Sequence, residues 1–482
     1  MRISRPSIFI LSVFLSFFVF SCKKDKLLTD GGSLKFSTDT LTFDTVFTEM
    51  GSFTTAFKIF NPNDQRIVIK NLKLDKGDSS FFKMNVDGFS GNNINNIEVA
   101  AHDSIYVFAT VKIDPKNQSN PFVIEDRFTA TLNGQIFSIP FIAYGQDAHY
   151  VVDSVLAVSD VWKTDKPYVI LHSALVDKGK TLTIPAGCKI YMNADSRLYV
   201  RGQLFINGTK KDSVIFQGDR LDRAYFGYDD YPGEWGGIYF DSTSTGSNIK
   251  WTVFKNCGNN MKGGLPFGIE VFGKPGIANQ LTMTNTIIEN SIGFGLLCFQ
   301  ANVKAENTLV HSTGTQALAL VQGGNYQFDN CNFINYFPSK LSHYDEPTVV
   351  VLNYYQISNT EYWQGDLTAH FRNCLIYGSM DNELFCYKKG TATYNASFDH
   401  CLIKSIDALN TDLTTSGELN IQFCIFNKNP RFVDYKKWNF SPDSASSVIH
   451  KGMAILGISN DLNDQPWSVT DTFDIGAYRF VK

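Results

Sequence analysis

Apolar and polar side chains alternate along much of the chain between residues 34 and 148. In the clearest stretch, residues 105, 107, 109, 111 and 113 are apolar and fall on one side, while Tyr106 and Lys112 fall on the other. Such alternation is typical of a strand in an antiparallel sheet with one buried face. Six further strands are predicted at 41–47, 55–60, 67–74, 81–86, 128–132 and 135–142.

The last two of these strands are joined by Asn133-Gly134, a dipeptide that favours a type I′ hairpin turn. Several short strands within one segment of this length predict an Ig-like β-sandwich over residues 34–148. Residues 149–165 carry no comparable pattern and are interpreted as a connector.

A different pattern follows and extends to the end of the chain. Short apolar segments are separated by Gly or Asn turns, and one six-residue segment recurs: an apolar residue, any residue, Asn, Cys or Thr, any residue, and an apolar residue. The clear copies are 328–333, 371–376 and 398–403, and weaker copies are 283–288, 305–310 and 421–426. The third positions are Asn285, Asn307, Asn330, Asn373, His400 and Phe423, which gives steps of 22, 23, 43, 27 and 23 residues. A base period of this size, with longer steps for loops, predicts a solenoid.

The recurring segment can be interpreted as two strands joined by a bend. Phe371 and Phe398 are predicted to point inward from one strand, and Cys374 and Ile376 to point inward from the next. Asn373 lies between them and tolerates the left-handed backbone conformation that such a bend requires. Because His400 and Phe423 replace Asn, the last coils are expected to turn differently.

With these motifs, residues 166–482 resemble the right-handed parallel β-helix family of pectate-lyase-like proteins. The resemblance implies an all-β solenoid whose coils pair through parallel strands. Segments 429–434, 446–449 and 474–478 resemble the closing motif of exported β-helix proteins and imply a C-terminal cap. The segment 43–47, followed by Gly51-Ser52 and Asn61-Pro62, resembles the Ig-like module of Bacteroidota surface lipoproteins, in which it serves as a spacer or docking domain.

The first 22 residues are predicted to be a signal peptide, because Arg2 and Arg5 precede a short apolar run. Residues 19–22 resemble a bacterial lipobox, which implies cleavage before Cys22 and acylation of that residue. The lipid would tether the protein to the outer membrane, on its surface or its periplasmic face. Residues 23–33 would then form the tether, and an ordinary secretory peptide is the alternative.

Composition narrows the choice of partner. The formal net charge is −4, from 43 basic and 47 acidic residues, which argues against nucleic acid. Cys331, Cys374, Cys401 and Cys424 share one repeat position with Thr252, Thr286 and Thr308. Because Thr replaces Cys there, buried unpaired thiols are favoured over disulfides between coils. A metal site is the weakest interpretation, since no Cys-x-x-Cys pair is present.

The strand that carries the active site in β-helix enzymes has few residues here that could act in catalysis. If the first and third residues of each strand point inward, the outward second position holds Glu270, Leu297, Ala319, Val350 and Phe385. One carboxylate provides neither an acid/base pair nor a calcium cage. No catalytic residue, cofactor or metal is therefore assigned, and the apolar row predicts that a loop or a partner covers this face.

Two groups of loop residues remain as candidate sites. Asp229, Asp230 and Glu234 form an acidic loop, interpreted as solvated, with calcium or substrate binding as the alternative. Long excursions near 336–346 and 355–367 hold the candidate binding aromatics Tyr336, Tyr344, Tyr354, Tyr355, Tyr362 and Trp363. Insertions of a solenoid often build its binding surface, and aromatic side chains stack on sugars or anchor protein interfaces.

These observations favour an exported, membrane-anchored binding or structural protein whose partner is a glycan or an envelope protein. Two alternatives stay open: a β-helix polysaccharide lyase or glycoside hydrolase, and an accessory subunit of an outer-membrane complex. The enzyme alternative requires acidic side chains clustered with Lys or Arg across two or more coils.

Overall fold

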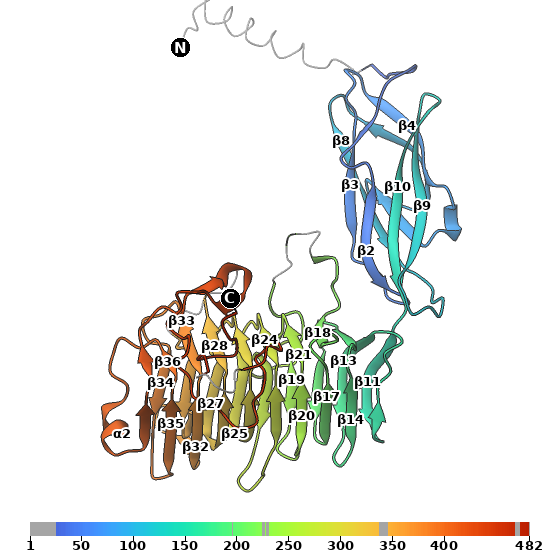
Figure 1. Ribbon diagram of the computed structural model, residues 1–482. Coiled ribbons are helices and arrows are strands. Elements are labelled where there is room, and N and C mark those ends of the chain that lie inside the picture. Colours follow the sequence, from blue (N-terminus) through green and yellow to red (C-terminus); the bar gives the residue numbers. More distant parts are fainter. Residues whose placement is uncertain are drawn as a thin grey trace, which may run out of the picture. The chain divides into compact units, whose positions relative to one another are not determined.

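A computed structural model describes residues 26–194, 196–223, 227, 231–336, 346–467 and 473–481. The chain divides into two compact units, Met1–Asp147 and Ala148–Lys482 (Figure 1). Cys22, Asp229, Asp230 and Tyr344 lie outside the described residues. Within the described ranges, no helix is long and apolar enough to cross a membrane.

The first unit is a sandwich of two five-stranded sheets. One sheet has the order β1 (Lys35–Phe36), β3 (Thr55–Phe60), β8 (Ser104–Val111), β5 (Phe82–Val86) and β6 (Phe89–Ser90). The other has the order β2 (Leu41–Phe47), β10 (Gln135–Gln146), β9 (Phe122–Leu132), β4 (Ile67–Leu74) and β7 (Asn93–Val99). All pairs are antiparallel except β2 with β10.

The sequence pattern of the sandwich has a direct structural counterpart. The apolar residues at 105, 107, 109, 111 and 113 are buried, whereas Tyr106 and Phe108 are exposed. Asn133 and Gly134 have φ values of 46° and 84°, as a type I′ turn requires. Phe57, Phe128 and Phe141 meet at the centre, with ring centroids 5.2 and 5.8 Å apart for successive pairs. The prediction missed β7, whose Asn-rich sequence alternates poorly.

The second unit is a solenoid of parallel strands in three long sheets. We call them the groove sheet, the polar sheet and the strap sheet. The groove sheet contains β16 (Arg197–Val200), β19 (Ile238–Phe240), β22 (Phe267–Phe272), the first parts of β25 (Phe294–Glu306) and β27 (Leu318–Asp329), β29 (Val349–Leu352) and β34 (Leu384–Tyr387).

The polar sheet follows the groove sheet in each coil. It contains β12 (Asp160–Val161), β14 (Thr181–Pro185), β17 (Gln203–Asn207), β20 (Ser247–Lys250), β23 (Leu281–Thr284), the second parts of β25 and β27, β32 (Leu367–Arg372), β35 (Tyr394–Asp399) and β37 (Leu419–Gln422).

The strap sheet completes each coil. It contains β15 (Lys189–Met192), β18 (Val214–Gly218), β21 (Thr252–Lys255), β24 (Ile287–Glu289), β26 (Leu309–His311), β28 (Asn332–Asn335), β33 (Leu375–Gly378), β36 (Leu402–Ile403) and β38 (Ile425–Phe426). β11 (His149–Leu156) and β13 (Tyr168–Val176) each run through the strap sheet and into the groove sheet.

Residues 149–165 are therefore no connector. β11 pairs with β13, and β12 pairs with β14, so this segment forms the first coil. The first coil pairs with another coil on one side only, and Val152 and Val155 are exposed. The segment therefore lacks the pattern of a buried strand, on which the prediction relied.

The recurring Asn position is a left-handed bend between the polar sheet and the strap sheet. Asn285, Asn307, Asn330 and Asn373 have φ values of 50°, 45°, 50° and 53°. The expectation that His400 and Phe423 turn differently is wrong, because their φ values are 50° and 52°. The predicted inward rings are confirmed: Phe328, Phe371 and Phe398 stack in the core at 4.9 and 4.5 Å.

The Cys/Thr position after each bend makes one recurring hydrogen bond. Its hydroxyl or thiol donates to the carbonyl two residues earlier, from Thr308 to Glu306 (3.1 Å) and from Cys374 to Arg372 (3.4 Å), for example. Of the eight described cysteines, all of which are free, seven are buried, as predicted for interior positions. Thr and Cys therefore alternate because both can donate this bond in a small buried space.

Residues 429–467 and 473–481, which we call the strap, lie along the side of the solenoid instead of closing only its far end (Figure 1). They include β39 (Phe432–Asp434) and β40 (Asn439–Pro442). Strap residues such as Phe440 and Ile475 pack on Ile334 and Leu375 of the strap sheet. The Lys210 ammonium group donates to the Leu462 carbonyl at 3.2 Å, so the strap reaches back to early coils. The short helix α2 (Thr411–Thr415) buries Leu413 against the solenoid core near the last coil.

Candidate functional site: an aromatic groove

The outward face of the groove sheet is apolar over successive coils. The predicted register is confirmed: Ile269, Leu296, Leu318 and Val349 point into the solenoid core, and the residue after each points outward. Leu297, Ala319 and Val350 form an outer cluster with Phe267, Phe299 and Val321. The outer face therefore has an apolar core of its own.

A β-hairpin lies over part of this outer cluster, as the prediction of a covering loop required. Its strands are β30 (Tyr354–Gln356) and β31 (Tyr362–Gln364), which pair Tyr355 with Trp363. The Tyr355 ring contacts the edge of Phe299 at a centroid distance of 5.1 Å. The hairpin covers the cluster incompletely, so an open groove of about 520 Å³ remains beside it.

The groove combines aromatic walls with a few polar groups. It is lined by Phe294, Leu297, Phe299, Val350, Tyr354, Tyr355 and Phe385, among others, and by the polar side chains of Gln316, Glu346 and Gln356. The Gln316 amide donates a hydrogen bond to the Glu346 carboxylate. An apolar pocket with few oriented polar groups is the usual composition of a ligand site.

Exposed rings continue from the groove onto its rim. Trp363, Phe385 and Tyr387 are 53%, 46% and 40% exposed. The rings of Phe385 and Tyr387 are parallel within 3°, with centroids 5.9 Å apart. The Lys389 ammonium group lies 4.5 Å from the centre of the Tyr354 ring, which holds that ring in place. The rim therefore presents flat apolar surfaces to solvent.

The predicted aromatic residues are only partly brought together. Tyr354, Tyr355, Tyr362 and Trp363 share the hairpin, whereas Tyr336 follows β28 and lies against the strap, 4.6 Å from the ring of Tyr435. Burial raises the pKa of Tyr336 well above its ordinary range. Tyr336 is therefore a packing residue and does not belong to the groove.

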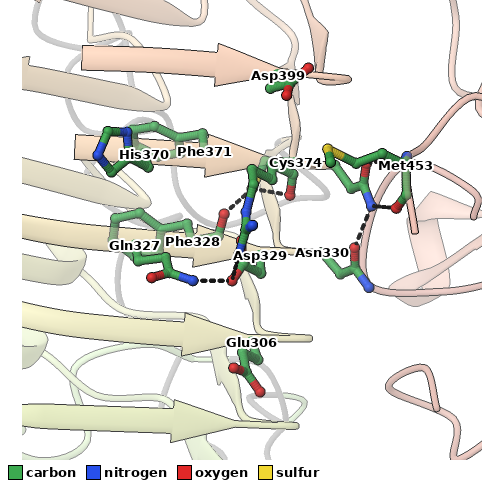
Figure 2. A network of polar contacts seen from close by, with 12 residues as sticks. Glu306, Gln327, Phe328, Asp329, Asn330, His370, Phe371, Cys374, Asp399 and Met453 are labelled. Carbon is green, nitrogen blue, oxygen red and sulfur yellow. Dashed lines mark hydrogen bonds and ion pairs between the residues drawn. The ribbon is translucent and has the colours of Figure 1, made fainter. Parts of the chain in front are cut away.

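Sequence reasoning missed a row of charged side chains on the polar sheet. It occupies the position just before each bend residue and includes Glu306, Asp329, Arg372 and Asp399 on successive coils. The Arg372 guanidinium group donates to the Asp329 carboxylate, which is labelled in Figure 2, with nitrogen–oxygen distances of 2.7 and 2.8 Å. The signal is the second position of the recurring segment, which is charged in four successive copies: Glu306, Asp329, Arg372 and Asp399.

This row provides acids and a base on adjacent coils, as the enzyme alternative requires, but its carboxylates are already paired. Asp329 is 1% exposed and also accepts from Gln327 at 2.6 Å. Lys304 lies 2.6 Å from Glu306, and the His400 ring lies 2.7 Å from Asp399. Paired carboxylates are poorly suited to act as acid and base in glycoside hydrolysis, so the row is better explained by ion pairs, one of which, Arg372 with Asp329, joins two coils.

The acidic loop is also different from its prediction. Glu234 is buried and ion-paired with Arg223 at 2.5 Å, and its carboxylate accepts from the Gly218 amide at 3.1 Å. Burial raises the pKa of Glu234 to about 7, although the positive charge of Arg223 opposes this shift. The expectation of a solvated loop is therefore wrong for Glu234. Among the described residues, no group of three or more His, Cys, Asp or Glu side chains is arranged to hold a metal ion.

Glu270 is the one carboxylate on the outward row of the groove sheet. Its pKa is raised to about 7, chiefly by burial, with the Arg197 charge acting in the opposite direction. Its neighbours in register are Tyr239 and Leu297, neither of which is a carboxylate. A lone acid of this kind has no second carboxylate at hand for glycoside hydrolysis.

The comparisons with known proteins concern the solenoid. Residues 170–333 match the family model described as "Right handed beta helix region". No curated protein matches the sequence. A solved GH87 alpha-1,3-glucanase catalytic domain in complex with tetrasaccharides is 10% identical over 79% of each chain, with a TM-score of 0.24. A family 123 glycoside hydrolase from Clostridium perfringens is 9% identical over 23% of this chain and 25% of that chain, with a TM-score of 0.17. The family match and the parallel pairing of its strands identify the solenoid as a right-handed parallel β-helix.

Proposed function

We propose that this protein is an envelope lipoprotein that binds a glycan chain in the aromatic groove. The observation that carries the proposal is the open groove beside the hairpin β30–β31, with the exposed rings of Trp363, Phe385 and Tyr387 on its rim. Sugar rings have an apolar face of C–H groups that stacks on aromatic rings, and hydroxyl groups that need polar partners. Gln316, Glu346 and Gln356 supply such partners inside the groove.

The same proposal includes the location of the protein. Acylation of Cys22 would hold the solenoid at the outer membrane, where envelope and extracellular glycans are within reach. The formal net charge of −4 leaves little electrostatic attraction for nucleic acid. The sandwich would then act as a spacer between the anchor and the solenoid.

The proposal is tested with Trp363→Ala and Phe385→Ala, measured against a glycan array and then by titration calorimetry. Each substitution should weaken binding by about five-fold or more, because truncating an aromatic anchor typically costs about 1 kcal/mol or more. Phe423→Ala is the matched control, since Phe423 is 74% exposed but lies on the last coil. Absence of binding to every envelope glycan tested would refute the proposal. A stoichiometric protein in a pull-down of the native lipoprotein would then indicate a complex subunit.

Hydrolysis remains a second candidate because of the charged row of the polar sheet. In this case Asp399 would be the candidate carboxylate, because its side chain is the most exposed of the three acids in the row, at 28%. Release of reducing ends from a polysaccharide, abolished by Asp399→Asn, would support hydrolysis. Binding without turnover would favour the groove proposal.

A further inference from the structure

A second groove, different in chemistry, lies at the bend between the groove sheet and the polar sheet. Its volume is about 470 Å³. One wall is the loop 274–278, and the floor comes from β25, β27 and the start of β32. The polar side chains that line it are Lys274, Gln300, Asn302, Asn325, Asp366 and Thr368. We call it the polar groove.

Three of these side chains repeat along the solenoid axis. Asn302 pairs in register with Asn325, and Asn325 pairs with Thr368, so they hold one position on three successive coils. Neighbouring parallel strands lie about 4.8 Å apart, which sets the spacing of this row. The polar groove therefore offers a line of amide and hydroxyl groups at regular intervals.

The charges of the polar groove balance each other. Lys274 contributes one positive charge and Asp366 one negative charge. The Asp366 carboxylate accepts from the Thr393 amide at 2.8 Å and from the Thr393 hydroxyl at 2.9 Å, and these bonds lower its pKa. Asp366 thus remains an ionised acceptor. Amides and hydroxyls both donate and accept, which matches the hydroxyl groups of an uncharged sugar better than a phosphate or a sulfate.

The two grooves are connected by the same strands. Phe299 lines the aromatic groove, and the next residue, Gln300, turns the chain with a φ of 45° and lines the polar groove. On the following coil Val321 lines the aromatic groove, and Asn325 lines the polar groove. At about 3.3 Å per residue, Phe299 and Asn302 are within roughly 10 Å along the strand.

We propose that the polar groove is a second subsite of the glycan-binding surface, specific for an uncharged oligosaccharide that continues from the aromatic groove across the bend. This inference rests on the proposed function. It adds that the ligand is a chain of several sugar units, held by stacking in one groove and by hydrogen bonds in the other. Affinity therefore increases with chain length until both grooves are filled.

The test uses the full chain and linear glucan and mannan oligosaccharides, from disaccharide to octasaccharide, with titration calorimetry. Lys274→Ala and Asn325→Ala should each weaken octasaccharide binding several-fold and leave disaccharide binding unchanged. Asn395→Ala is the matched control, because Asn395 continues the same row one coil beyond Thr368 and does not line the groove. Trp363→Ala should weaken binding of every length.

Hydrogen–deuterium exchange supplies a second readout that does not depend on the variants. A bound octasaccharide should slow exchange in 274–278 as well as in 354–364, whereas a disaccharide should protect only the hairpin. If affinity is independent of length, or if the octasaccharide leaves 274–278 unprotected, the polar groove is not a subsite and the aromatic groove alone binds. If no oligosaccharide binds, this inference and the proposed function both fail for uncharged glycans.

Discussion

The bends of the solenoid fall into two regions that share a backbone but differ in side chain. Under the strap, Asn373 donates to the Met453 carbonyl at 2.7 Å and accepts from the Met453 amide at 2.8 Å. Asn307 donates to the Asn460 carbonyl at 2.8 Å. In the last coils His400 and Phe423 have the same left-handed φ, and their rings contact each other at 5.0 Å.

The comparison shows that the backbone conformation of the bend and the hydrogen bonds of its side chain are separate requirements. The bend itself needs only a residue held at positive φ by its neighbours, and even Phe423 satisfies this need. Asn adds an amide that hydrogen-bonds the bend of the neighbouring coil, as Asn373 does with Asn330, and the strap where the strap covers the bend. The residue type at the bend position therefore depends on the chain that packs outside the solenoid as well as on the local backbone conformation.

The largest predicted effect is that of Arg372→Ala, on a coil whose bend lies under the strap. It would leave the buried Asp329 carboxylate without its cation, although Gln327 still donates to it. Breaking a buried ion pair in this way typically costs 3 to 5 kcal/mol of unfolding free energy, and we expect about 3. Gln422→Ala occupies the equivalent position in the last coil and should change stability by less than about 0.5 kcal/mol. If chemical denaturation gave the two variants equal losses of unfolding free energy, the covered and uncovered regions would not differ in this respect.

Asn373→Ala tests the bend residue directly. It removes three hydrogen bonds, two to Met453 and one to Asn330 at 2.9 Å, from a fully buried site. A loss of roughly 2 to 3 kcal/mol is expected, because buried backbone groups are left unpaired. Phe423→Ala should cost far less, since its ring is 74% exposed. Limited proteolysis should cut the strap faster in Asn373→Ala only; unchanged cleavage would show that these bonds do not hold it.

The covered region should contribute a pH dependence of its own through Glu289. Glu289 lies 3.2 Å from Lys255 and 3.5 Å from His311, and His311 contacts the strap through Phe440 at 4.9 Å. Burial alone would raise the pKa of Glu289, but the hydrogen bond and charge of His311, with the charge of Lys255, outweigh it and lower the pKa. A lowered folded-state pKa stabilises the fold above about pH 4, and this contribution is lost as the pH falls further.

The matching variant is Glu289→Gln. At pH 7 it should reduce stability by about 1 to 2 kcal/mol, and below pH 4 the difference from the native protein should shrink. Thermal unfolding across this pH range measures both effects. A constant difference at every pH would show that the charge of Glu289 is unimportant.

The smallest effect is expected at the Cys/Thr position, which is common to both regions. Cys374→Thr should be nearly neutral, because Thr308 already makes the same bond in the same environment. Cys374→Val cannot donate to the Arg372 carbonyl and should cost about 1 kcal/mol. Cys424→Val should behave alike, since Cys424 donates to the Gln422 carbonyl at 3.4 Å. If Val and Thr are equivalent at position 374, the position is selected for size alone.

The features that could be predicted from sequence are those set by local periodicity. Alternation defined the strands of the sandwich, and the six-residue segment defined the bend, the inward rings and the inward thiols. The outward register of the groove sheet followed as well, because strand side chains alternate with a period of two. The aromatic groove was predictable in part, since the apolar row and the hairpin aromatics were both recognised.

The features that could not be predicted depend on contacts distant in sequence. The strap has no period, so its position on Asn307 and Asn373 could not be inferred from its own residues. Glu234 was expected in solvent because its partner Arg223 and the Gly218 amide approach it only through the fold. The polar groove arises from three coils and a loop, which only the winding of the chain brings together.

The strap also determines the order in which parts of the solenoid can fold during synthesis. Lys210 and Leu462 are 252 residues apart, so this contact forms only after residue 462 has left the ribosome. Coils can stack one after another as they emerge, because each pairs with the one before it. Sealing of their side must wait for the C-terminus, and closing so long a loop is slow. A product that stops before the strap would therefore expose an unsealed side to proteases, so resistance to proteolysis depends on synthesis of the strap.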